Sequence, residues 1–375
     1  ASDTAKTLHI EISHKRGVLF DYEGEQCKVH DHHVREWRHL NFFQHECFLR
    51  ARVPRVKTSD GKVKLIDVPW AGPGSSFTLL FEDQLVEFAQ KGMSISGLSE
   101  QVGISWGRAQ RILLRRTCEA LASQELANVE ALSVDETSRH KGHNYFTIMA
   151  DRDCKKVVGV AVGKDKDAFA HALIDMEVRG ADRKQVKTLT MDMSKSYISA
   201  AQKFIPHSTV IFDRFHIMKK LNEAVDQVRR QEQQQFKQDF KKSRYIWLKN
   251  ASKLTDKQQQ RVNQLSEAYP TIGTAYRLKE MFKHILDQAY HSSDLSAIAT
   301  WLDEAYNSQV EPIQKFVKTI LNHWEGVQSF FEHLASNALA ERINLKIQEI
   351  KRVAKGFRNP HNFMLMIYFH LGKLN

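Results

Sequence analysis

Alternating apolar and polar residues in the middle of the chain predict a group of β-strands. The apolar run 131–134 is followed by two alternating segments, 144–150 and 156–162. Because successive side chains of a strand point to opposite faces, a period of two places one face of each segment on a core. We expect an antiparallel meander here. Further along, the pattern predicts a helix over 167–178, a strand ending at 192, a helix over 195–204 and a strand over 208–212.

Helical periodicity takes over after Arg214 and continues nearly to the end of the chain. The order of strands and helices before that point resembles a ribonuclease H-like fold, which implies an α/β core with a mixed sheet. In that fold the first and fourth strands are neighbours, so Asp135 and Asp192 are expected side by side. Asp192 and Glu341 are 149 positions apart, too far for a direct return to the core, so a helical insertion is predicted between them. Its aromatic residues are expected to form a core of their own, although one of them could stack on a base at an opened DNA end.

Three acidic residues stand in contexts that deliver carboxylates to one site. Asp135 ends an apolar strand-forming run, Asp192 ends another, and Glu341 lies in a long helical pattern. Carboxylate oxygens are the ligands that hard divalent ions prefer, and two such ions about 4 Å apart activate the attacking oxygen and stabilise the leaving one in phosphoryl transfer. We therefore predict Asp135, Asp192 and Glu341 as catalytic ligands of two Mg²⁺ or Mn²⁺ ions. Taken singly, an aspartate at a strand end is more often a turn or cap residue.

Polar residues around these acids extend the candidate site. Asn337, Glu341 and Asn344 follow one another at spacings of four and three, which places them on one helical face. Buried polarity on such a face is easier to explain by a metal site than by packing. His216 opens the helix after the fifth strand, where it could position a phosphate or a water or simply be a buried histidine, whereas Asp213 is expected to cap that helix.

A helix-turn-helix pattern follows the Pro-, Gly- and Ser-rich linker at 68–76. It consists of a short helix, Gly103 at the turn, and a second helix capped by Ser105. One side of the second helix carries Arg108, Arg111 and Arg115. Arginines in that position could reach phosphates or guanine edges in a major groove. Helix pairs of this spacing also occur as plain structural hairpins, but the basic side favours DNA binding.

The residues before the linker mix short alternating stretches with many histidines, which predicts a small β-rich module. Cys27 and His30 form a clean pair of possible zinc ligands. A tetrahedral zinc site needs four ligands, and no second pair follows at the expected spacing. We therefore doubt a zinc site here and expect the histidines to lie at the surface or to face DNA.

Composition adds a preference for nucleic acid and excludes a membrane protein. Of 375 residues, 42% are hydrophobic, enough for a sizeable core over two or three domains. Lys and Arg outnumber Asp and Glu by 55 to 44, and the net charge of +11 favours an acidic partner. We find no apolar run of membrane-span length and no signal-peptide pattern at the start of the sequence. The four scattered cysteines fit a reducing compartment.

With these residues in view, the chain resembles bacterial insertion-sequence transposases of the ISL-three group over nearly its whole length. The motifs that carry the resemblance are 133–136, 191–193 with Tyr197, 212–216 with Asn222, 336–344 and 351–359. The resemblance implies a DDE triad at Asp135, Asp192 and Glu341. Segments 35–40, 54–56 and 68–70 resemble that family's N-terminal zinc-binding module. Cys27 matches the module, but Thr58 and Gly61 stand where further ligands are usual.

The sequence thus predicts five parts: a small β-rich, degenerate zinc-finger-like module (1–75), a helix-turn-helix domain (76–125), the first part of a ribonuclease H-like core (130–232), a helical insertion (233–328), and a final catalytic helix with a basic segment (329–375). In the last part, DNA contacts are expected from Lys351, Arg352 and Arg358.

The function these parts imply is that of a DDE transposase. It would bind the terminal inverted repeats of its element, cut double-stranded DNA and transfer the strand to target DNA. Bringing two ends together implies a homodimer or a larger homo-oligomer, working in the bacterial cytoplasm at the nucleoid. Two alternatives stay open: a ribonuclease H-like nuclease or resolvase that cuts without joining, and a non-catalytic DNA-binding protein derived from a transposase.

Overall fold

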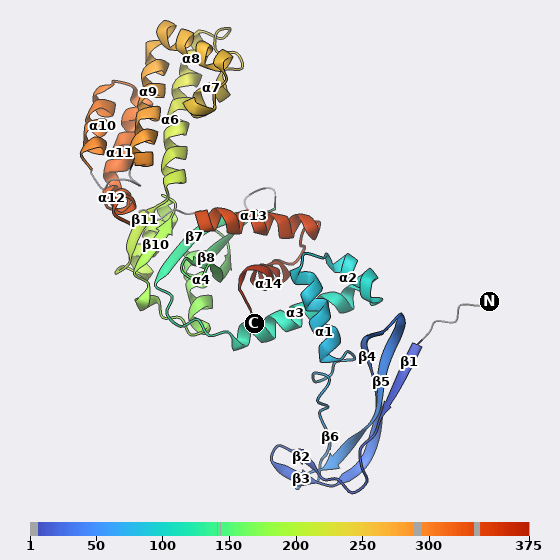
Figure 1. Ribbon diagram of the computed structural model, residues 1–375. Helices are drawn as coiled ribbons and strands as arrows, with labels where there is room; N and C mark the ends of the chain where they lie inside the picture. Colours follow the sequence, from blue (N-terminus) through green and yellow to red (C-terminus); the bar gives the residue numbers. More distant parts are fainter. Residues whose placement is uncertain (1–6, 141, 143, 289–294, 334–337, 375) are drawn as a thin grey trace, which may run out of the picture. The chain divides into compact units, whose positions relative to one another are not determined.

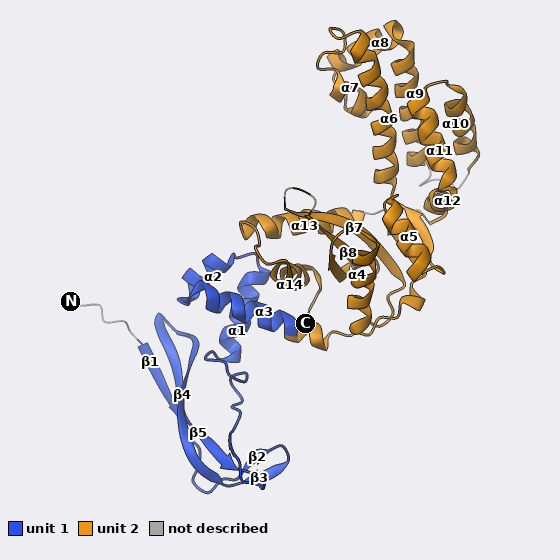
Figure 2. Ribbon diagram, turned by 180° about the vertical axis from the view of Figure 1, so that it is seen from behind, with its two compact units in different colours: residues 1–118 blue, residues 119–375 orange. Residues whose placement is uncertain are grey.

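The computed structural model describes residues 7–140, 142, 144–288, 295–333 and 338–374. The chain divides into two compact units, residues 1–118 and 119–375 (Figure 2). The first unit holds a β-rich module followed by helices. The second holds a five-stranded sheet with the helices that pack on it and a helical extension.

Two long antiparallel strands dominate the β-rich module. The hairpin strands β4 (Val29–Phe42) and β5 (His45–Lys57) pair along most of their length, while β1 (Thr7–Ile12) runs parallel to β5 and β6 (Val63–Leu65) runs antiparallel to it. A separate hairpin joins β2 (Phe20–Tyr22) to β3 (Glu25–Cys27). The prediction of a small β-rich module is confirmed.

The segment predicted as a linker at 68–76 has no helix or strand, as expected, but it is packed against the module. The Trp70 ring meets the buried Trp37 ring edge to face at 5.6 Å, and Ala71 is buried in the same small cluster. Apolar packing therefore fixes the course of this segment.

Three helices complete the first unit: α1 (Leu79–Gln90), α2 (Ile95–Val102) and α3 (Trp106–Ser123), whose last turn passes into the second unit. Ser94 caps α2 by accepting a hydrogen bond from the Gly97 N–H. Gly103 ends α2 in the left-handed conformation at φ 68°, which glycine adopts without the steric cost of a side chain. The predicted helix, glycine turn and second helix are therefore present, with the second helix starting one residue after Ser105.

The sheet of the second unit has the strand order β11-β10-β7-β8-β9. Its strands are β7 (Ala131–His140), β8 (Asn144–Asp151), β9 (Lys156–Val162), β10 (Thr188–Met191) and β11 (Thr209–Phe212). The predicted meander is confirmed, because β7, β8 and β9 pair antiparallel, whereas β10 lies parallel to both β7 and β11. The connecting elements are α4 (Lys166–Val178), a short 3₁₀ turn (Arg183–Gln185) and α5 (Lys195–Phe204).

Helix α6 (Arg214–Gln235) follows β11 directly and leads out of the sheet into a helical extension (Figure 1). The extension contains α7 (Arg244–Leu248), a 3₁₀ turn (Ala251–Lys253), α8 (Asp256–Ala268), α9 (Pro270–Gln288), α10 (Ser296–Asn307) and α11 (Glu311–Asn322). Trp247, Phe282 and Trp301 are buried within it, which confirms the prediction that its aromatic residues form a core.

The chain returns to the sheet through α12 (Trp324–His333), which packs on β11. The approach is so close that a Cβ at Gly326 would overlap the Phe212 ring. Two helices then finish the chain: α13 (Ala338–Val353) packs on β7, and α14 (Pro360–Leu371) packs on β9. This return places α13 beside the strand that carries Asp135.

Candidate functional site

Three aspartates stand at the same level, one on β7 and two directly after the neighbouring parallel strands β10 and β11. Ser133 of β7 pairs with Thr190 of β10, and Asp135 and Asp192 each lie two residues further on. Met191 of β10 pairs with Phe212 of β11, which places Asp213 level with Asp192. The predicted neighbourhood of Asp135 and Asp192 follows from this register. Asp135 itself lies within β7, which continues past it to residue 140.

Local backbone amides hold one carboxylate oxygen of each aspartate. Oδ1 of Asp135 accepts from the Glu136 N–H at 2.8 Å, Oδ1 of Asp192 from the Ser194 N–H at 3.0 Å, and Oδ1 of Asp213 from the Phe215 N–H at 3.2 Å. The last bond confirms Asp213 as the cap of α6. Each carboxylate is thereby oriented by its own turn of chain.

The electrostatic surroundings of Asp135 show that these acids act on one another. The pKa of Asp135 is raised to about 6, mainly by burial; the charges of Asp192 and Asp213 also raise it, while the Glu136 N–H bond and His216 lower it. Ionising this carboxylate beside two other acids is costly, and a bound cation would offset that cost. The position is therefore one where a cation would be stabilised.

Helix α13 is bound to β7 through one polar face. Asn344 Nδ2 donates to Asp135 Oδ2 at 2.8 Å and to the Glu136 carbonyl oxygen at 3.3 Å. One turn later, Gln348 Nε2 donates to Thr137 Oγ1 at 3.0 Å. Asn344 Oδ1 is buried and has no hydrogen-bond partner among the described residues. A buried acceptor without a donor beside a carboxylate fits a ligand or an ordered water at this position.

Glu341 lies one turn before Asn344 on α13 and is exposed. It lines a cavity of about 1200 Å³ together with Asp213. Within the described ranges, no three or more His, Cys, Asp or Glu side chains are grouped closely enough to hold a metal ion. The convergence of Glu341 with Asp135 and Asp192 on metal ions therefore stays a prediction. Asn337, predicted on the same helical face, lies outside the described residues.

His216 is only partly buried and stands on the first turn of α6. Its Nε2 is 3.9 Å from Asp213 Oδ2, and its proximity is among the causes that lower the pKa of Asp135. The side chain therefore belongs to the surroundings of the three aspartates. Its part in positioning a phosphate or a water stays a prediction.

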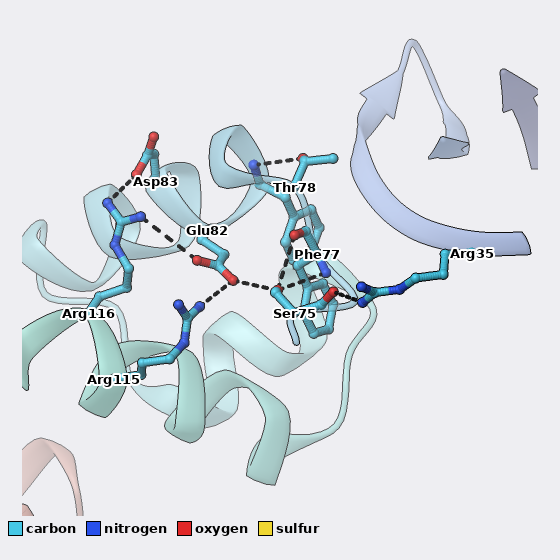
Figure 3. Close-up of polar contacts among 9 residues, drawn as sticks. Arg35, Ser75, Phe77, Thr78, Glu82, Asp83, Arg115 and Arg116 are labelled. Carbon is cyan, nitrogen blue, oxygen red and sulfur yellow. Dashed lines mark hydrogen bonds and ion pairs between the residues drawn. The ribbon is translucent and has the colours of Figure 1, made fainter. Parts of the chain in front are cut away.

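In the helix-turn-helix, the three predicted arginines differ in their surroundings. Arg108 and Arg111 are exposed near the start of α3. Arg115 donates to the fully buried carboxylate of Glu82 on α1, which Arg116 also approaches at 3.8 Å (Figure 3). Ser75 Oγ donates to the same carboxylate at 2.8 Å. This network shows that Arg115 has a structural partner within the unit, and its predicted DNA contact is untested.

The basic residues at the end of α13 also differ. Lys351 Nζ donates to the Ser138 carbonyl oxygen of β7 at 3.0 Å, so its charge is held near the sheet. Arg352 and Arg358 are exposed. The predicted contacts of these three residues with DNA remain predictions.

The N-terminal module presents a poor set of zinc donors. Burial raises the pKa of the Cys27 thiol, and the nearby acids Glu25 and Asp21 raise it further, which disfavours the thiolate that zinc needs. Across from it, Ser59 donates its N–H and its Oγ to Glu25 Oε2, at 3.2 and 3.1 Å. Hydrogen bonds thus join the two turns of this module, and the lack of a zinc site in it stays a prediction.

Comparison with known families places the chain. Residues 132–367 match the ISL3 family of DDE transposases, described simply as transposase. Residues 66–117 match the helix-turn-helix domain of transposase family ISL3, and residues 24–59 match the zinc-finger of transposases IS204, IS1001, IS1096 and IS1165. The chain belongs to the ISL3 transposase family, and the resemblance expected from its motifs is confirmed.

Curated relatives agree with this assignment. The transposase for insertion sequence element IS1001 of Bordetella parapertussis is 25% identical over 377 residues, which cover 97% of this chain and 92% of that protein. The transposase for insertion sequence element IS1557 of Mycobacterium tuberculosis is 24% identical over 356 residues, covering 87% and 79% respectively. The protein is a DNA-binding DDE transposase of an insertion sequence. None of the helices in the described part of the chain combines the length and apolarity needed to span a membrane.

Sequence reasoning missed part of the site's surroundings. The sequence predicts only a capping role for Asp213, because the register of β10 and β11 that places it level with Asp192 is not readable from the sequence. Gln348, which binds Thr137, carried no signal, because nothing in a single sequence says which strand a helix will meet. The cavity that Glu341 and Asp213 line was likewise not predictable from the sequence.

Proposed function

We propose that this transposase binds the terminal inverted repeats of its element, cuts the DNA there in a metal-dependent reaction and joins the freed 3′-hydroxyl to a target phosphate. The observation that carries the proposal is the common level of Asp135 and Asp192 on paired strands, with α13 bound to the same strand through Asn344. With the convergence of Glu341, which lies one turn from that hydrogen bond, these carboxylates would supply the donor set that phosphoryl transfer on divalent ions requires.

The proposal includes a ribonuclease H-like core. Its support is the sheet order, in which an antiparallel meander is extended by two parallel strands on the side of β7. We also propose the five-part division 1–75, 76–125, 130–232, 233–328 and 329–375. Helix α6 would then continue from the core into the insertion, since it extends to residue 235.

The residues at the site fit divalent ions such as Mg²⁺ or Mn²⁺. Asp135 has two other aspartates in its electrostatic surroundings, and the buried Asn344 Oδ1 has no hydrogen-bond partner among the described residues. Asp135, Asp192 and Glu341 would hold two ions, which supply activation of the attacking oxygen and stabilisation of the leaving one.

The chain's own residues orient this chemistry. The Asn344 amide and the Glu136 N–H fix the two oxygens of Asp135, so that its carboxylate keeps one orientation. The Ser194 N–H does the same for one oxygen of Asp192. Below them the buried Tyr197 hydroxyl bonds with Thr147 Oγ1 at 2.9 Å, which ties α5 to β8 and supports the strand ends. His216 and Asn344 are supporting residues in this scheme.

End recognition is assigned to the helix-turn-helix, with Arg108 and Arg111 reading the repeat and Arg115 approaching the DNA backbone. Lys351, Arg352 and Arg358 would contact DNA near the site. Joining two ends requires at least a homodimer, because each end needs its own set of carboxylates. The substrate places the reaction at the nucleoid in the bacterial cytoplasm.

The test is an assay of cleavage and strand transfer with Mg²⁺, the full chain and a duplex that carries one element end and its flank. Asp192→Asn and Glu341→Gln are each expected to lower both reactions by roughly 10³-fold or more, as when one member of a catalytic group is removed. Glu349→Gln is the matched control, because Glu349 lies further along the same helix, is exposed and pairs with Lys346. Cleavage without joined product would identify a nuclease instead. Full activity of Asp192→Asn would contradict the assignment.

A further inference from the structure

A groove of about 1200 Å³ runs beside α6 in the second unit. Helix α6 lines one side, and Arg244 of α7, Lys283 of α9 and Glu341 of α13 contribute to the rest. Helix α6 rises from the end of β11 toward α7 and α8 (Figure 1). Because Glu341 and Arg244 both line the groove, it joins the candidate catalytic Glu341 to the insertion. We call this cavity the α6 groove.

Five of the α6 residues that line the groove form a stripe along the helix: Phe215, Lys219, Asn222, Asp226 and Arg230. Their spacings of three and four keep them on one face. From the first to the last the helix rises about 22 Å at 1.5 Å per residue. That length matches about six base steps of one DNA strand at 3.4 Å each.

A buried carboxylate organises the far end of the groove. Asp226 accepts hydrogen bonds from Arg229 Nε at 2.7 Å and Arg230 Nε at 3.0 Å, and Arg244 Nε lies 3.6 Å from it. Arg229 is buried with Asp226, whereas the side chains of Arg230 and Arg244 are 66% and 53% exposed and line the groove. Three guanidinium groups share this carboxylate, so the α7 end is net positive even with Glu223 one turn away.

This arrangement holds two arginines in place for an anion. A guanidinium carries five N–H donors in a fixed plane, so a group anchored on one side by Asp226 still has donors for a phosphate. Because the ion pairs with Asp226 already restrict the Arg230 and Arg244 side chains, these side chains lose less conformational entropy when they bind a phosphate.

One exposed aromatic ring lines the groove, and a second follows a lining residue in the sequence. Phe215 lines the groove and is 56% exposed, whereas Tyr245 follows the lining residue Arg244 on α7 and is 75% exposed. The Arg244 guanidinium lies 6.0 Å from the centroid of the Tyr245 ring. Neither ring contributes to the buried core. Exposed aromatic rings beside a positive groove are the combination that binds single-stranded nucleic acid by stacking.

We propose that the α6 groove binds one strand of the DNA next to the scissile phosphate. Arg230 and Arg244 contact its phosphates, and Phe215 and Tyr245 stack on its bases. The inference rests on the proposed catalytic role of Glu341, which places the reacting phosphate at one end of the groove. The new element of the proposal is a binding path for the DNA strand, formed by residues of α6 and of the helical insertion.

The first test measures how the affinity of the full chain for DNA depends on salt. The DNA carries one element end with a single-stranded flank, and EDTA prevents cleavage. Arg230→Ala/Arg244→Ala is compared with Arg277→Ala/Lys315→Ala. These control side chains, on α9 and α11, are also ion-paired and 53% and 63% exposed, but they do not line the groove.

A plot of log affinity against log salt falls with a slope whose magnitude grows by roughly 0.7 for each phosphate contact on a single strand. Loss of two contacts is therefore expected to reduce the magnitude of this slope by about 1.4 in the groove variant. The control pair should leave the slope unchanged. The same slope in both variants would overturn the proposal. An equal reduction with a fully double-stranded flank would show that the groove binds duplex and would overturn it too.

The second test uses the unaltered chain and therefore does not depend on the stability of a variant. With 5-iodouracil in the single-stranded flank, ultraviolet light is expected to cross-link the DNA to Phe215 or Tyr245, identified by mass spectrometry. Cross-links found only in residues 1–118 would overturn the proposal. Neither test requires cleavage. If the catalytic assay contradicts the roles of Asp192 and Glu341 but both binding tests give the expected result, the groove binds DNA and only the catalytic assignment is wrong.

Discussion

The side-chain amide of Asn344 donates a 2.8 Å hydrogen bond to Oδ2 of Asp135, and so joins α13 to β7 across 209 residues of sequence. The same helix carries Glu341 one turn earlier. Whatever fixes Asn344 against the strand therefore also fixes how far Glu341 stands from the two aspartates.

Replacing Asn344 with Ala removes this link while leaving all three acids in place. We expect cleavage to slow about tenfold, which corresponds to about 1.4 kcal/mol, the size of one hydrogen bond to a charged group. Affinity for end DNA should be unchanged. Leu345→Ala is the control, because Leu345 is next to Asn344 in the sequence and its side chain is 72% exposed. Equal losses in the two variants would mean that the bond between Asn344 and Asp135 has no special role.

The raised pKa of Asp135 predicts a pH-dependent stability. Because its pKa is about 6 in the folded chain against an ordinary 3.8, the folded state binds this proton more tightly than the unfolded state. The resulting stabilisation is complete below about pH 3.8 and is lost as pH rises through about 6. Asp135→Asn, which cannot ionise, should gain thermal stability relative to the original chain across this window, measured by unfolding in EDTA. A difference in melting temperature that is the same at about pH 4 and pH 7.5 would contradict this cause.

The helix-turn-helix should give sequence preference through its exposed arginines. Arg108→Ala/Arg111→Ala is expected to weaken binding to the terminal repeat more than to random DNA, by about 1 to 3 kcal/mol per lost base contact. Competition binding on the two DNAs measures the ratio, with Lys91→Ala at the end of α1 as the control for loss of an exposed charge. Equal losses on both DNAs would reduce these arginines to phosphate contacts.

The zinc-finger match and the donor set of the N-terminal module lead to opposite expectations. We predict that the purified chain binds no zinc tightly through residues 20–65, because Thr58 and Gly61 supply no ligand and Ser59 already bonds with Glu25. Elemental analysis after dialysis tests this. One zinc per chain, lost in Cys27→Ala, would restore a metal-binding module.

The amino-acid sequence was informative where secondary structure follows from the local pattern of residues. The apolar run of β7 and the alternation of β8 and β9 predicted the meander. Gly103 predicted the turn between α2 and α3, where the structure has a φ of 68° that favours glycine. Asp135 and Asp192 were expected side by side from the resemblance to a ribonuclease H-like fold, in which the first and fourth strands are neighbours, and the pairing of Ser133 with Thr190 agrees with that expectation.

Contacts between distant elements could not be predicted in this way. Arg115 stands with Arg108 and Arg111 in the helical pattern, yet it donates to buried Glu82, because a carboxylate without water requires a cationic partner. The grouping of Arg230 and Arg244 around Asp226 likewise depends on where α7 folds back onto α6. A single sequence does not contain that information in readable form.

The central claim is that Asp192 is a direct ligand of the catalytic ion, and a change of metal preference tests it most directly. Asp192→Cys replaces a hard oxygen ligand with a soft sulfur, which binds Mg²⁺ poorly and Mn²⁺ better. We predict that this variant is inactive in cleavage with Mg²⁺ and regains activity with Mn²⁺, while Glu349→Cys is active with both ions. Full activity of Asp192→Cys with Mg²⁺ would contradict the account.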